Sequence, residues 1–237
     1  MTGRPSISLL LRVIGAKSRR TRSNETFDGY LTAPDGAAKV PGILLITAIF
    51  GVDQEMRELS DAWANDGFIV SVPDIFWRQI SGPTADMTVA FERYGKFDPV
   101  QGMKDIEDLL VDLKSRPQCN GKVAILGFCF GGRYALLGAA RLGIAAAASF
   151  HGTAMGQHVD EVGKITCPVS FHYGDSDHVV PMDEVNAIQK AFAGRANADI
   201  RAYPGVGHNF SMPRKQGYDA AVAKESRARV LSCFKGM

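Results

Sequence analysis

Val123-Ala-Ile-Leu-Gly-Phe-Cys129-Phe-Gly-Gly-Arg-Tyr-Ala135 is the stretch that decides the fold. It opens with a short apolar run rich in β-forming residues, passes through Gly127-Phe-Cys-Phe-Gly131, and continues into helix-forming residues. This order predicts a strand, a sharp turn and a helix. It is the context of a nucleophile elbow, the pattern Gly-x-Ser-x-Gly, here with cysteine in the place of serine.

The chemistry of an elbow requires each residue type in this pentapeptide. The turn strains the backbone of the nucleophile, and only small residues two positions before and after it fit against the neighbouring strand and helix. The thiol of Cys129 would be exposed above the sheet, and the Phe130 amide could donate to a developing oxyanion. The alternative interpretation is a buried structural cysteine between glycines.

Composition indicates an ordinary globular protein. At 237 residues the chain is predicted to form one domain over 1–237, and its hydrophobic fraction of 46% provides for a substantial core. A net charge of +2 gives no reason to expect nucleic acid or a membrane surface as a partner. The four cysteines form no C-x-x-C pair, so the chain is expected to be cytoplasmic and reduced, without a zinc site.

Residues 1–24 are treated as an N-terminal extension. They contain several arginines but no Asp or Glu, and the apolar segment at 7–14 is interrupted by Arg12. A signal peptide is one interpretation and a transit peptide is another. The interpretation favoured here is a surface extension packed by a few leucines.

Strand and helix patterns alternate along the rest of the chain. This predicts an α/β fold with a mostly parallel central sheet and helices on both faces. The segment 75–98 shows little periodicity and is interpreted as a long functional loop. Strands are predicted at 26–32, 41–47, 68–72, from 123, and at 144–150, 167–173 and 199–203, and helices at 53–66, 99–116, after the elbow, and at 182–192 and 218–234.

Two further residues stand where predicted strands end. Asp177 follows the strand at 167–173, and His208 follows the strand at 199–203. Because active groups of a parallel sheet gather beyond the carboxyl ends of its strands, both are expected near Cys129. The order Cys, Asp, His along the chain is that of α/β-hydrolases. Considered separately, Asp177 could be a turn residue and His208 a loop histidine.

Each of these residues has a chemical role to fill. A thiol is only slightly ionised at neutral pH, so Cys129 needs a base, and His208 can take its proton and later return one to the leaving group. Asp177 would hold the imidazole in the correct tautomer. Asp175 is the rival acid. Of the other histidines, His151 is expected to line the pocket and His172 to be packed within a strand.

At this point the sequence resembles the dienelactone hydrolase (carboxymethylenebutenolidase) family of α/β-hydrolases. The resemblance spans about residues 26–235 and implies Cys129, Asp177 and His208 as the triad, an oxyanion hole from the Ile49 and Phe130 amides, and no large cap domain. It rests on Ile49-Phe-Gly-Val52, Val72-Pro-Asp74, Gly127-Phe-Cys-Phe-Gly-Gly132, Gly174-Asp-Ser-Asp-His-Val-Val-Pro181 and Gly207-His-Asn-Phe210.

The sequence also departs from this family. Where members that open dienelactones carry an activating Glu, this chain has Ala48, and where they bind the substrate carboxylate with two arginines it has Met87 and Met212. We therefore expect a more apolar pocket that favours neutral esters over anionic lactones. The predicted pocket residues are Ala48, Phe50, Met87, Phe91, Tyr94, His151, Asn209 and Met212, and Arg78, Arg93 and Arg214 are nearby in sequence.

The resulting prediction is a carboxylic ester hydrolase that acts on small esters or lactones through a thioester, with a Cys129–His208 ion pair present at rest. No metal or organic cofactor is expected, the partner is a small-molecule substrate, and the chain is a monomer or homodimer. A soft thiolate can also attack phosphotriesters. The alternatives are a thioesterase or acyltransferase with the same triad, and a catalytically silent ligand-binding module.

Overall fold

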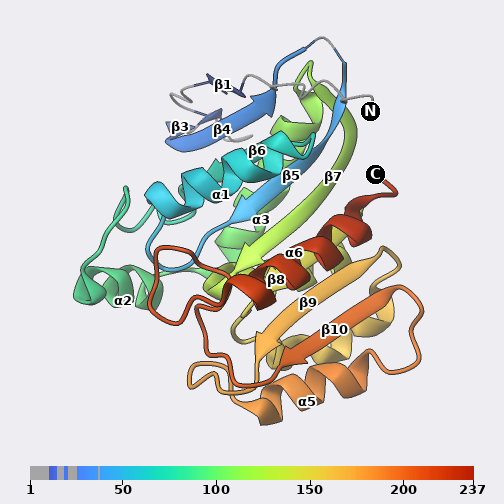
Figure 1. Ribbon diagram of the computed structural model, residues 1–237. Coiled ribbons are helices and arrows are strands. Elements are labelled where there is room, and N and C mark those ends of the chain that lie inside the picture. Colours follow the sequence, from blue (N-terminus) through green and yellow to red (C-terminus); the bar gives the residue numbers. More distant parts are fainter. Residues whose placement is uncertain (1–10, 15–18, 21–25, 37) are drawn as a thin grey trace, which may run out of the picture.

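The protein is built around one eight-stranded sheet (Figure 1). The computed structural model describes residues 11–14, 19–20, 26–36 and 38–237. The order across the sheet is β1-β4-β6-β5-β7-β8-β9-β10, and all strands from β6 to β10 in this order run parallel to one another. The strands are β1 (Leu11–Ile14), β4 (Gly29–Pro34), β5 (Val40–Ile46), β6 (Ile69–Pro73), β7 (Cys119–Phe128), β8 (Ala146–Phe150), β9 (Val169–Gly174) and β10 (Ala198–Tyr203), beside a separate pair, β2 (Arg19–Arg20) and β3 (Thr26–Phe27).

Helices cover both faces of the sheet, and an apolar cluster fills each interface. One cluster packs α1 (Gln54–Asn65) and α6 (Ala220–Phe234) on the sheet. The other packs α3 (Pro99–Ser115), α4 (Gly132–Arg141) and α5 (Met182–Ala191) on the opposite face. None of the helices in the described part of the chain is long and apolar enough to cross a membrane. The parallel strands from β6 to β10 and the helices on both faces confirm the predicted α/β architecture with a mostly parallel sheet.

The helix boundaries follow from capping chemistry that is visible in the sequence. Asp53 precedes α1 and accepts a hydrogen bond from the Met56 amide at 2.9 Å. Asp98 caps α3 in the same way, directly before a proline that suits the first turn of a helix. These caps account for why the predicted and observed starts of both helices agree within one residue.

The prediction of an irregular segment at 75–98 is wrong in part. A helix, α2 (Met87–Gly95), occupies it, capped by Asp86, which accepts a hydrogen bond from the Thr88 amide at 2.7 Å. Periodicity failed to reveal α2 because its buried residues are Ala90 and Arg93, so its inward side carries a charge where a large apolar residue would be expected. In Figure 1, α2 lies beyond the arrowheads of β5 and β7.

The amino-terminal segment also differs from the expectation of a surface extension. Residues 11–14 add β1 to the edge of the sheet by antiparallel pairing with β4. Pairing of backbone groups leaves almost no signal in the side-chain pattern of so short a strand. Apart from Arg19–Arg20, the rest of the segment 1–24 lies outside the described residues, and so do the leucines before residue 11 that were expected to pack it.

Candidate active site

Cys129 lies at the sharp turn that joins β7 to α4. It opens a single 3₁₀ turn, η1 (Cys129–Gly131), and has a φ of 49°, in the left-handed region. A Cβ on Gly127 would lie 2.2 Å from the Gly131 carbonyl oxygen, and one on Gly131 would lie 2.1 Å from the Ile46 carbonyl oxygen. Only glycine fits at these two positions, as the elbow pattern predicts. The Cys129 side chain is left half-buried at the carboxyl end of β7.

His208 and Asp177 meet at the same edge of the sheet. Asp177 follows β9, His208 follows β10, and Nδ1 of His208 lies 2.7 Å from Oδ2 of Asp177. The second carboxylate oxygen accepts hydrogen bonds from the Val179 and Val180 amides at 2.7 and 3.1 Å. The Asp177 side chain is fully buried, so its position is fixed by these bonds.

Asp175, the rival acid, faces elsewhere. Its side chain accepts hydrogen bonds from Ser176 and from the Gly205 amide, at 2.9 and 2.8 Å. It therefore joins two surface loops, and the histidine is oriented by Asp177.

The surroundings of His208 favour its protonated form. Burial alone would lower its pKa, but the hydrogen bond and charge of Asp177, together with the proximity of Cys129, raise the pKa of His208 to about 9. Its Nε2 atom is buried and accepts or donates no hydrogen bond within the described part of the chain. A cationic imidazole with a free nitrogen beside a thiol is the arrangement that activates a cysteine.

A second histidine packs against the first. The ring centroids of His151 and His208 are 4.5 Å apart. His151 is buried and has a φ of 43°. Its burial is the main reason that its pKa lies well below the usual range, and the nearby charge of His208 adds to this effect. His151 is therefore a neutral ring that supports His208. His172 is packed within β9, as expected, where it bonds Ser170 and Tyr203.

The two predicted oxyanion residues lie at matched positions in the turns that follow two neighbouring strands. In the pairing of β5 with β7, Ile46 stands opposite Gly127, and Ile49 and Phe130 each follow three residues later. The turn after β5 is closed by a hydrogen bond from the Gly51 amide to the Ala48 carbonyl at 3.2 Å. The Ile49 carbonyl accepts two hydrogen bonds from Arg93, at 2.8 and 2.6 Å.

The predicted pocket residues fall into two groups. Met87, Phe91 and Tyr94 lie on α2 with exposed side chains, so this helix presents an apolar surface beyond the sheet. Ala48 and Met212 are buried, and Met212 packs in the apolar cluster of α1 and α6. The structure does not bring Met212 to the same exposed surface as Met87.

Asn209 lies in the loop that follows His208, and Phe50 lies close to this loop. The ammonium of Lys215 is 4.7 Å from the centroid of the Phe50 ring, and the Asn209 amide donates to the Gln216 carbonyl at 3.3 Å. Lys215 also pairs with Asp53 at 3.7 Å. This loop therefore connects the surroundings of His208 to the start of α1.

The three arginines that are nearby in sequence are all held by protein groups. Arg78 bonds Asp105 at 2.9 and 3.0 Å, and Arg214 bonds Glu58 at 2.8 and 2.6 Å. Arg93 is fully buried and bonds only backbone carbonyls among the described residues. Sequence reasoning missed the contact of Arg93 with the oxyanion segment, because a lone arginine in a short helix carries no motif.

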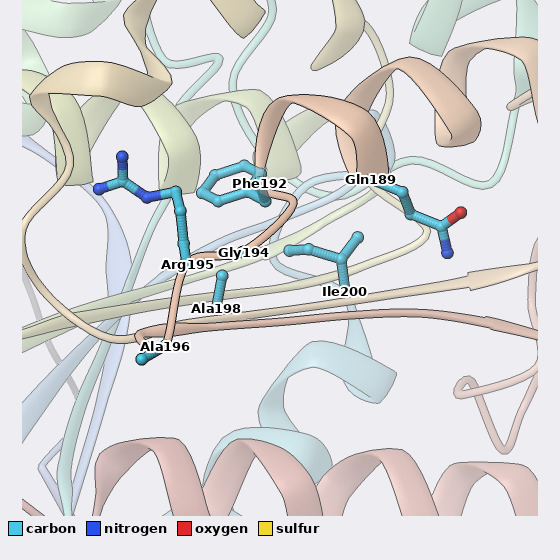
Figure 2. A pocket seen from close by; sticks show the side chains of 7 residues that line it. All are labelled: Gln189, Phe192, Gly194, Arg195, Ala196, Ala198 and Ile200. Carbon is cyan, nitrogen blue, oxygen red and sulfur yellow. The ribbon is translucent and has the colours of Figure 1, made fainter.

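A hollow of about 480 Å³ lies at the other end of the sheet (Figure 2). It is formed where the chain passes from α5 into the start of β10, and none of the predicted site residues lines it. Within the described ranges, no three His, Cys, Asp or Glu side chains are grouped as metal ligands. The predicted catalytic and oxyanion residues therefore all follow the carboxyl ends of β5, β7, β9 and β10.

Comparisons with known proteins agree with this architecture. The model of the Dienelactone hydrolase family matches residues 27–237. Carboxymethylenebutenolidase of Pseudomonas putida is 29% identical over 219 residues, which cover 88% of this chain and 93% of that protein. Carboxymethylenebutenolidase 1 of Cupriavidus pinatubonensis is 30% identical over 217 residues, which cover 89% of this chain and 92% of that protein.

Solved structures share the fold of this chain. A Klebsiella pneumoniae structure of the dienelactone hydrolase type superposes with a TM-score of 0.86 at 25% identity, covering 97% of this chain and 100% of that chain. A dienelactone hydrolase-like promiscuous phosphotriesterase from metagenomic libraries has a TM-score of 0.81 at 21% identity, covering 95% of this chain and 98% of that chain. The match of the family model to nearly the whole chain shows that this protein is a hydrolase of the dienelactone hydrolase family.

Proposed function

We propose that this hydrolase cleaves small neutral carboxylic esters or lactones, with Cys129 as nucleophile, His208 as proton carrier and Asp177 as the group that orients His208. The observation that carries the proposal is the 2.7 Å bond between His208 Nδ1 and Asp177, which leaves Nε2 free on the side of Cys129. A buried acid, a cationic imidazole and a half-buried thiol in this order can form and break an acyl-enzyme.

The first half of the reaction is acylation. The Cys129 thiolate attacks the carbonyl carbon, and the carbonyl electron pair moves onto oxygen, where the Ile49 and Phe130 amides would stabilise it. The tetrahedral intermediate collapses as the bond to the leaving oxygen breaks. His208, whose pKa is raised to about 9, supplies the proton that makes the leaving group a neutral alcohol.

The second half is hydrolysis of the thioester. His208 has now lost its proton and can accept one from a water molecule. The resulting hydroxide adds to the thioester carbonyl, the carbon–sulfur bond breaks, the carboxylic acid is released, and the thiolate of Cys129 is regenerated. The negative charge of Asp177 stabilises the imidazolium that forms in this step. Two amide hydrogen bonds keep this carboxylate in place beside the ring.

The state of three arginines that lie near the site in sequence favours a neutral substrate. Arg78, Arg93 and Arg214 are all engaged by protein groups, so none of these three guanidinium groups is left to bind a substrate carboxylate in a bidentate manner. The exposed side chains of α2, Met87 among them, offer apolar contact instead.

The decisive experiment compares wild type with Cys129→Ala on p-nitrophenyl acetate, with intact mass measured during turnover. We expect loss of activity in the variant and an acetylated wild-type intermediate. Equal activity in both proteins would rule out Cys129 as the nucleophile. Transfer of the acetyl group to an added thiol or alcohol, in preference to water, would favour an acyltransferase. A Cys129 that resists alkylating reagents would favour a silent binding module.

A phosphotriester is a second candidate substrate. A soft, polarisable thiolate can displace p-nitrophenolate from phosphorus, and water can then release the phosphoryl group from sulfur. The metagenomic phosphotriesterase is only 21% identical to this chain, so it shows a shared fold and not a shared substrate. The proposal of a phosphotriester substrate therefore rests on the chemistry of the thiolate nucleophile. Release of p-nitrophenolate from paraoxon by wild type, and its absence with Cys129→Ala, would support it.

A further inference from the structure

Arg93 is fully buried, although arginine is rarely found there unless it is paired. Its guanidinium donates to three backbone carbonyls. Nε and Nη2 bond the Ile49 carbonyl at 2.8 and 2.6 Å, and Nη1 bonds the Gly82 carbonyl at 2.6 Å and the Ile80 carbonyl at 3.3 Å. Arg93 thereby joins α2, the segment before it, and the turn after β5.

The same guanidinium is linked to the second predicted oxyanion residue. It lies 4.7 Å from the centroid of the Phe76 ring, and the Phe76 ring lies 5.0 Å from that of Phe130. Phe130 is buried within this aromatic group. Displacement of Arg93 would therefore disturb the packing at the ends of both β5 and β7.

No carboxylate among the described residues lies within salt-bridge distance of Arg93. Burial lowers the pKa of Arg93, and the charge of Asp74 opposes this effect. The Asp74 carboxylate itself accepts hydrogen bonds from Phe76, Ser81 and Gly82, at 3.1, 3.0 and 2.7 Å. Asp74 thus shapes the loop whose carbonyls Arg93 binds, and the positive charge of Arg93 remains directed at the Ile49 carbonyl.

We infer that Arg93 is a positioning residue that holds the Ile49 backbone in place for oxyanion binding and adds its charge to the stabilisation of that oxyanion. This inference rests on the proposed function. Two hydrogen bonds on one carbonyl fix the orientation of the peptide that follows Ile49, and hence the turn that carries the Ile49 amide. Dipoles that are fixed before the reaction need not reorganise in the transition state, which is where an oxyanion hole gains its effect. A cation buried beneath the turn acts in the same direction.

The test separates oxyanion stabilisation from thiol reactivity. Acylation by p-nitrophenyl acetate creates an oxyanion, whereas alkylation of Cys129 by iodoacetamide is a displacement at saturated carbon that creates none. For Arg93→Gln we expect single-turnover acylation to fall about tenfold to hundredfold, with KM changed by less than about threefold and the alkylation rate unchanged. Arg93→Lys keeps the charge but cannot span the three carbonyls, so its loss should be smaller.

Arg78→Gln is the matched control. Arg78 also anchors the segment 75–98, but its hydrogen bonds at 2.9 and 3.0 Å go to Asp105 on α3. This variant should lose stability without losing acylation. In Arg93→Ala, added guanidinium below denaturing concentration should restore part of the acylation rate, because the vacated site matches its shape.

Several results would overturn the inference. One is unchanged acylation in Arg93→Gln, and another is an equal loss of acylation and alkylation, which would indicate general damage to the site. If Arg93→Gln does not fold, Arg93→Lys decides: acylation equal to that of wild type would sink the inference. Failure of the proposed function would look different, since Cys129→Ala would then keep its activity, whereas failure of this inference alone leaves Cys129→Ala inactive.

Discussion

The imidazole of His208 is fixed by Asp177 through a 2.7 Å hydrogen bond, while the other oxygen of the same carboxylate is bonded to two backbone amides. The carboxylate therefore cannot turn away from the histidine without losing both amide bonds. This arrangement determines which nitrogen of His208 faces Cys129.

Asp177→Asn should abolish most activity while leaving the fold intact. The amide can bond Nδ1 in the wrong tautomer, so Nε2 would no longer be a base toward Cys129. We expect kcat to fall by about 10³–10⁴. Asp175→Asn, two residues away and bonded to Gly205 instead, is the control and should keep nearly full activity. Comparable losses in both variants would contradict the assignment of Asp177.

The pH dependence of acylation should differ between leaving groups. The pKa of His208 is raised to about 9, so its proton is present at neutral pH and is lost as the pH rises through that value. An alkyl ester needs this proton on its leaving oxygen, whereas p-nitrophenolate does not. Acylation by an ethyl ester should therefore decline above about pH 9 while acylation by p-nitrophenyl acetate does not. Identical profiles for the two substrates would refute this role of His208.

The two packed histidines should respond differently to substitution. His208→Asn removes the proton carrier and should lower single-turnover acylation by an alkyl ester at least about 10³-fold. His151→Asn keeps a neutral side chain and suits the left-handed backbone at φ 43°, so acylation should stay within about tenfold of wild type. A loss in His151→Asn as large as that in His208→Asn would assign His151 a direct part in proton transfer.

The elbow glycines should be intolerant of even one added methyl group. In Gly131→Ala the new Cβ would lie 2.1 Å from the Ile46 carbonyl oxygen, which belongs to the backbone and cannot move aside cheaply. We expect a loss of at least about 3 kcal/mol in the free energy of unfolding, measured by urea titration, or failure to fold. Gly163→Ala, where no atom lies within 4 Å of the new Cβ, should change stability by less than about 1 kcal/mol.

A single arginine on α2 should alter substrate preference. Met87 is 49% exposed, so Met87→Arg can be accommodated, whereas Met212 is 3% exposed and Met212→Arg would bury an unpaired charge. We expect Met87→Arg to raise kcat/KM for p-nitrophenyl hemisuccinate about threefold to tenfold relative to p-nitrophenyl butyrate. Met87→Gln controls for the loss of methionine, and an unchanged ratio of the two substrates would mean that position 87 does not face the substrate.

Much of the fold could be predicted from the sequence because its elements are short and their signals are local. Buried parallel strands appear as continuous apolar runs. Asp53 and Asp98 are N-cap residues that mark the starts of α1 and α3. The helix α2 was missed although Asp86 caps it, because Arg93 on its buried side is stabilised by carbonyls that lie as many as 44 positions away in the chain. The strand β1 was missed for a related reason, because it is defined by backbone pairing with β4.

By itself the sequence determined the order of most of the strands and helices, the elbow around Cys129 and the three residues proposed as a triad. Each of these depends on residue type at a fixed distance from a strand end. Only the tertiary structure decided that Asp177, and not Asp175, bonds His208, that His151 packs against it, and that Arg93 bonds Ile49 while Arg78 and Arg214 are held by acids. These relationships join residues that are distant in the chain, so they depend on how the strands are ordered in the sheet and how far each loop extends beyond it.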